Sequence, residues 1–138
     1  MPKQFVVQLN NEPGALATLA ERLAARGVDL RAIGGGGIGE SGHVIMTTAD
    51  DDGTREVLEA GRYTFIEGDS ILAEVDDRPG GMARIARELA SAGVNIYGHL
   101  FLGRWGDRAM FTFVVDQPDV ARPILEHNSE ADAHLSGM

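Results

Sequence analysis

One segment of this chain occurs twice. The residues NEPGALATLAERLAARGVDL at positions 11–30 return as DRPGGMARIARELASAGVNI at positions 77–96, without a gap and 66 positions later. The same offset also aligns Asp50 with Asp116. So long a match indicates a duplicated unit, and a duplicated unit restricts the chain to two copies of one architecture. We therefore expect one domain at residues 1–68 and a second at residues 69–138.

Each copy has the pattern strand, helix, strand, strand, helix, strand. In the first copy a β-rich run at residues 5–9 ends in a cluster of turn residues. Apolar positions then recur at helical spacing over residues 15–25, and Gly27 suits the end of that helix. The remaining elements expected in this copy are strands at 28–32, 43–49 and 63–66 and a helix at 55–60, capped from residues 50–52. Those expected in the second copy are strands at 71–75, 94–102, 109–115 and 129–136 and helices at 82–92 and 119–127. This βαββαβ order predicts an α+β fold of two tandem ferredoxin-like modules, each an antiparallel sheet with helices on one face.

An aromatic row is expected on the helix-free face of the second sheet. Tyr97, His99 and Phe101 alternate with Ile96 and other apolar or small residues, so strict alternation along a strand places these rings together. Such a face is more apolar than water favours, which indicates a covered surface. We expect a homodimer.

Charge and composition exclude several classes of partner. The formal net charge is -9, and Lys3 is the single lysine among scattered arginines. A nucleic-acid-binding or anionic-membrane-binding surface needs clustered positive charge, so neither partner is expected. No apolar run reaches the length of a membrane span, no signal peptide is visible and there is no cysteine. The expected location is the cytoplasm.

No pattern in the chain indicates catalysis. The run GGGGIG at residues 34–39 contains G-x-G-x-x-G but is followed by a strand pattern, so it predicts a pliable hairpin or strand end and not a dinucleotide site. Its glycines give this segment the mobility to act as a flap over a ligand. The histidines lack zinc-binding spacing, and the serines lack the G-x-S-x-G context of a nucleophile. We expect no catalytic residue, no metal and no cofactor.

The duplicated motif resembles the ACT domain, an amino-acid-sensing regulatory module of ferredoxin-like fold. The resemblance rests on NEPGAL and GVDL in the first copy and on RPGGM and GVNI in the second, and it covers about residues 3–127. It implies that modules pair side by side. It also implies that a small ligand, commonly an amino acid, lies where the first turn and helix start of one module face the second strand of its neighbour.

The resemblance assigns candidate ligand-binding residues to both copies. A helix N-terminus suits a carboxylate, glycines expose the backbone, and side-chain oxygens suit an ammonium group. Acidic residues at Asp29 and Asp77 would repel a carboxylate, so the two sites are expected to be unequal. The candidates are Asn11, Pro13, Gly14, Ala15, Asp29 and Leu30 in the first copy, and Asp76, Asp77, Gly80, Gly81, Met82, Asn95 and Ile96 in the second.

Two functions remain open at this point. The first is a non-catalytic amino-acid-binding regulatory protein, with ligand held between ACT modules and coupled to a partner enzyme or regulator. The alternative is a ligand-independent interaction or oligomerisation module that docks a metabolic enzyme through its aromatic sheet face.

Overall fold

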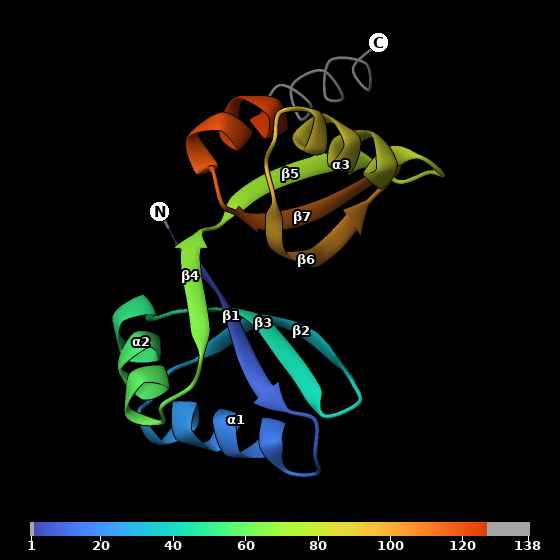
Figure 1. Cartoon of the computed structure of the whole chain (residues 1–138). Coiled ribbons are helices and arrows are strands. Elements are labelled where there is room, and N and C mark those ends of the chain that lie inside the picture. Colours follow the sequence, from blue (N-terminus) through green and yellow to red (C-terminus); the bar gives the residue numbers. More distant parts are fainter. Residues whose placement is uncertain (1, 127–138) are drawn as a thin grey trace. The chain divides into compact units, whose positions relative to one another are not determined.

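The computed structural model describes residues 2–126, and the chain divides into two compact units, Met1–Gly68 and Asp69–Met138. In the first unit the strands form one antiparallel sheet in the order β2-β3-β1-β4, with α1 and α2 on one of its faces (Figure 1). The helices bury Leu19, Leu23 and Leu58 against Phe5 and Met46 of the sheet. The elements of this unit are β1 (Lys3–Asn10), α1 (Ala15–Ala25), β2 (Leu30–Ile38), β3 (Ser41–Thr48), α2 (Asp51–Ala60) and β4 (Phe65–Asp69).

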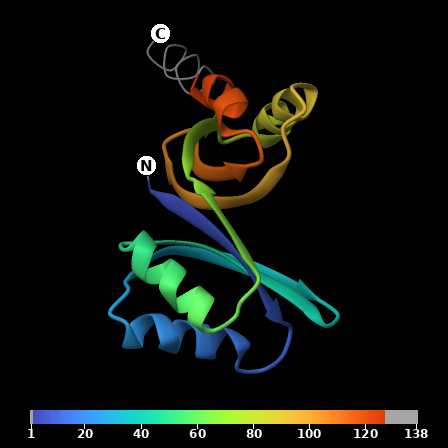
Figure 2. The same cartoon turned by 60° about the vertical axis from the view of Figure 1, so that its left-hand side comes forward.

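The second unit repeats this plan. Its antiparallel sheet has the order β5-β7-β6, and α3 and a helix at residues 118–126 lie on one face (Figure 2). Ile85 and Leu89 of α3 pack with Phe113 and Leu125 in its core. The closing strand expected at 129–136 lies outside the described residues. The elements are β5 (Ile71–Asp76), α3 (Gly81–Ser91), β6 (Ile96–Trp105) and β7 (Arg108–Val115).

The architecture confirms the predicted fold class of ferredoxin-like α+β modules. The cap on the second helix is also confirmed, because the Asp50 side chain accepts a hydrogen bond of 2.9 Å from the Gly53 N–H, where it satisfies a donor that the helix leaves free. A bidentate salt bridge joins α2 to β4. Arg55 Nε and Nη2 donate hydrogen bonds of 2.6 and 2.8 Å to the Glu67 carboxylate. These bonds lower the pKa of Glu67 below its ordinary value.

The predicted position of the aromatic row is wrong. Tyr97 is an extra residue in a β-bulge between Ile96 and Gly98, so the alternation of sides restarts there. His99 then pairs with Phe113, and Phe101 with Phe111, which belong to the core side of the sheet. His99 and Phe101 therefore lie on the side of the sheet that carries the helices, on the edge strand β6.

The glycine run is part of the sheet. Residues 34–37 belong to β2 and pair with residues 42–45 of β3, and the turn falls at Gly39 and Glu40. At Gly35 a Cβ atom would lie 2.3 Å from the carbonyl oxygen of His43, so the strands approach more closely than a side chain would permit. The prediction of a strand end is right, because these glycines are held in the hydrogen-bonded ladder next to the turn.

The alignment of the two copies needs one gap. Leu102 is a second extra residue, in a bulge between Phe101 and Gly103, and no bulge occurs at the corresponding place in β2. Beyond it, Ala49 N–H donates to the carbonyl of Asp29 as Asp116 N–H donates to that of Asn95, so Ala49 is the true equivalent of Asp116. The alignment of Asp50 with Asp116 was therefore coincidental.

Candidate functional site

A groove in the first unit lies between the start of α1 and the glycine run of β2. Its volume is about 430 Å³, and we refer to it as the glycine groove. Its walls are residues 9–12 at the end of β1, Ala15 and Leu16 of α1, residues 33–37 of β2 and residues 42–44 of β3. The groove is open because successive residues of β2 have no side chain to fill it.

The groove carries apolar side chains that face water. Leu16 is 51% exposed and Ile33 is 47% exposed, and they come from the helix and from β2 respectively. Each would lose unfavourable contact with water if an aliphatic group lay between them. The glycine groove therefore suits a ligand with an apolar part.

The start of α1 supplies the polar end of the groove. Gly14 precedes the helix with a φ of 88°, and no side chain of the described residues caps it. The N–H of Thr18 makes the first bond of the helix, 2.9 Å from the carbonyl oxygen of Gly14, which leaves the N–H groups of Leu16 and Ala17 without an intrahelical acceptor. Together with the partial positive charge of a helix N-terminus, these donors suit a carboxylate.

Asn11 joins the turn to the β2–β3 hairpin. Its backbone N–H donates to the carbonyl of Glu40 and its Nδ2 to that of Gly39, both at 2.9 Å. The side chain lies against Gly37, where a Cβ atom would come within 2.6 Å of the Asn11 Cγ. The amide is thus held in place at the groove wall, with Oδ1 available as an acceptor for an ammonium group.

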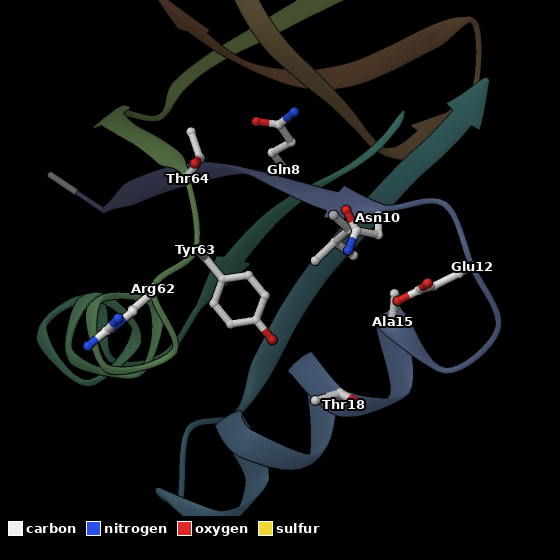
Figure 3. A pocket seen from close by; sticks show the side chains of 9 residues that line it. Gln8, Asn10, Glu12, Ala15, Thr18, Arg62, Tyr63 and Thr64 are labelled. Carbon is white, nitrogen blue, oxygen red and sulfur yellow. The ribbon is translucent and has the colours of Figure 1, made fainter. Parts of the chain in front are cut away.

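A second groove of about 480 Å³ lies on the β4 side of β1, bounded by Thr18 of α1 and residues 62–64. Tyr63 stands beside α1 with its hydroxyl directed towards the helix (Figure 3) and accepts a hydrogen bond of 3.4 Å from Arg22. Gln8 and Arg62 point away from this ring in Figure 3. Because Gln8 and Arg62 turn away from it, this groove is the weaker candidate.

Of the residues predicted for the first site, the structure brings Asn11 and Ala15 to the glycine groove. Pro13 and Gly14 form the turn beside it and do not line it. Leu30 pairs with Thr48 at the end of β2 remote from that turn, where it packs against the core. Asp29, which precedes β2, lies 3.5 Å from Arg31 in an exposed ion pair. Within their own unit these two residues are therefore not part of the groove.

The predicted second site is brought together only in part. Asp76, Gly80 and Gly81 line a smaller cavity of about 210 Å³, with Arg78 and Arg84. The Asp76 carboxylate already accepts bonds from Arg108 and Arg78, each at 2.9 Å. The role expected for Gly81 changes, because its Cβ would lie 2.1 Å from the carbonyl oxygen of Asp76. This glycine allows close packing of helix on strand rather than access for a ligand.

The other predicted residues of the second unit have structural contacts. Asp77 accepts a bond of 2.7 Å from Arg104 Nε. The backbone N–H of Asn95 donates to Asp116 at 2.8 Å, and Met82 and Ile96 pack against the core. The predicted list missed Leu16, Ile33 and the wall-forming glycines of β2, although the run of four glycines was visible in the sequence.

Solved structures share this fold and support the fold class predicted from the sequence. Protein BT0572 from Bacteroides thetaiotaomicron is similar with a TM-score of 0.68 and 21% identity, over 91% of this chain and 87% of that one. The regulatory subunit of aspartate kinase from Thermus flavus gives 0.64 and 18%, over 93% of both chains. That from Thermus thermophilus gives 0.58 and 20%, over 91% of both.

This chain has the tandem ACT fold. No protein-family model and no curated protein matches its sequence. Within residues 2–126, no helix has the length and apolar character needed to cross a membrane.

Proposed function

We propose that this tandem ACT protein is a non-catalytic regulatory protein that binds a free amino acid in the glycine groove of its first unit. The observation that carries the proposal is the position of an apolar-walled groove directly beside an uncapped helix start. An amino acid needs donors for its carboxylate and acceptors for its ammonium group, and the groove offers both within one small space.

The walls of the groove favour an aliphatic side chain. The carboxylate would bind the N–H groups of Leu16 and Ala17, and the ammonium group would bind Asn11 Oδ1 and the Glu12 carboxylate. An aliphatic side chain would then lie against Ile33. Charged side chains would lose water in this groove without gaining an opposite charge, so they are expected to bind more weakly.

The regulated partner is proposed to be an enzyme in the cytoplasm, with the protein acting as a homodimer. Two of the structurally similar proteins are regulatory subunits of aspartate kinase, which supports a partner enzyme. Regulation requires that the amino acid bind one arrangement of the protein better than another. A ligand-independent interaction module is the second candidate, favoured by the exposed rings of Tyr97, Phe101 and Trp105.

A thermal-unfolding panel of the common amino acids tests the proposal. L-valine, L-leucine and L-isoleucine are expected to raise the Tm most, because binding to the folded state alone stabilises it by about 2.7 kcal/mol when ligand is at a hundred times its Kd. L-lysine and L-aspartate are expected to have smaller effects. An unchanged Tm with every amino acid at millimolar concentration would contradict the proposed function and favour the interaction module.

A further inference from the structure

The corresponding strands of the two units can be matched residue by residue. Both begin with a bulge, between Leu30 and Ala32 in β2 and between Ile96 and Gly98 in β6. Gly35 therefore corresponds to Phe101. Beyond the extra residue Leu102, Gly37 corresponds to Arg104. Two glycines of the groove wall are thus replaced by two of the largest side chains.

These two side chains lie together on the helix side of the second sheet. The Phe101 ring stacks near Phe111, with 5.5 Å between ring centroids, and the Arg104 guanidinium lies 4.7 Å from the centre of the Phe101 ring. Arg104 pairs with Ala109, a residue of the core, which places it on this same side. They occupy the part of the second unit that corresponds to the open groove of the first.

The polar end of the second unit is also occupied. Asp77 replaces Asn11, and its carboxylate accepts a bond of 2.7 Å from Arg104 Nε. In the first unit, by contrast, the Asn11 amide lies directly against Gly37. Both members of this pair differ between the units. An amide (Asn11) faces a glycine in the first unit, and a carboxylate (Asp77) faces an arginine in the second. Arg104 thus takes the acceptor that an ammonium group would need.

The cavity at the start of α3 does not replace the groove. It is half the volume, about 210 Å³ against 430 Å³, and no residue of β6 lines it. Met82 packs against the core, whereas its equivalent Leu16 is 51% exposed. The apolar side chain at this position is therefore exposed to a ligand in the first unit, whereas in the second unit it is part of the core packing.

We propose that each chain binds one amino acid, in the first unit, and that Phe101 and Arg104 close the corresponding site of the second unit. This inference rests on the proposed function. The second unit then has a structural role and binds no amino acid. The side chains of Phe101, Arg104 and Asp77 fill the place that a ligand would occupy.

Isothermal titration calorimetry of the full chain with L-valine, L-leucine and L-isoleucine tests the stoichiometry. We expect one ligand per chain. Two ligands per chain would overturn this inference and leave the proposed function standing. Absence of binding by these three and by every other common amino acid would overturn the proposed function, and the inference with it.

A pair of double variants tests which unit holds the ligand. Asn11→Asp with Gly37→Arg copies the Asp77–Arg104 pair into the first unit and is expected to reduce affinity at least tenfold. The matched variant, Phe101→Ala with Arg104→Ala, changes only the second unit and is expected to keep the affinity within about twofold. The reverse result, with binding lost only in the second variant, would place the ligand in the second unit and overturn the inference. Circular dichroism of both variants checks that they are folded.

Discussion

Replacing Ile33 by aspartate is expected to weaken the binding of an aliphatic amino acid at least tenfold, which is about 1.4 kcal/mol. Ile33 lies on the β2 wall of the glycine groove and is 47% exposed. A carboxylate at this place would lose water when the aliphatic side chain of the ligand covers it. Calorimetric titration with L-leucine measures the change.

The matched control is Ile38→Asp in the same strand. Ile38 is 90% exposed, ends β2 and does not line the groove. Aspartate is unfavourable in any strand, so both variants are expected to lose a similar amount of folding stability, up to about 1 kcal/mol. The first variant alone should lose affinity. Equal affinities for the two variants would show that Ile33 does not contact the ligand.

Replacing Gly81 by alanine is expected to destabilise the second unit by about 2 kcal/mol. The added Cβ would meet the carbonyl oxygen of Asp76 at 2.1 Å, a backbone atom that can move only if the helix moves with it. Alanine is otherwise the better helix former by about 1 kcal/mol, so a stabilised protein would show that the predicted clash is absent. Urea unfolding followed by circular dichroism measures the difference.

The equivalent position of the first unit provides the control. Ala15 begins α1 as Gly81 begins α3, yet it carries a Cβ at the groove wall. Ala15→Gly is therefore expected to cost no more than about 1 kcal/mol, the ordinary penalty of glycine in a helix. A larger loss would mean that this methyl group supports the core as well as the groove.

The order of the elements followed from local signals. Each Pro-Gly turn precedes a helix, and the apolar strand patterns predicted β1, β3, β5 and β7 closely, because each of these strands buries apolar side chains in the core of its unit. The cap at Asp50 was equally visible, since an N-cap needs only residues next to one another in the chain.

The form of the site could not be predicted in the same way. The bulges at Tyr97 and Leu102 each reverse the side on which later residues lie, and no residue type marks them. The bond between Asp77 and Arg104 joins residues 27 positions apart, so its role in filling the second unit depends on the register of β6. The gapless alignment hid that difference because it matched Gly37 with the wrong residue.

An amide NMR titration with L-leucine tests the central claim most directly. Glycine amides occupy their own region of the spectrum, so residues 34–37 can be followed without interference from most of the chain. We expect these amides to shift together with those of Leu16 and Ala17, while the amides of residues 101–104 keep their positions in the spectrum. Shifts confined to residues 62–64 or 78–84, with the glycine amides unmoved, would contradict the claim.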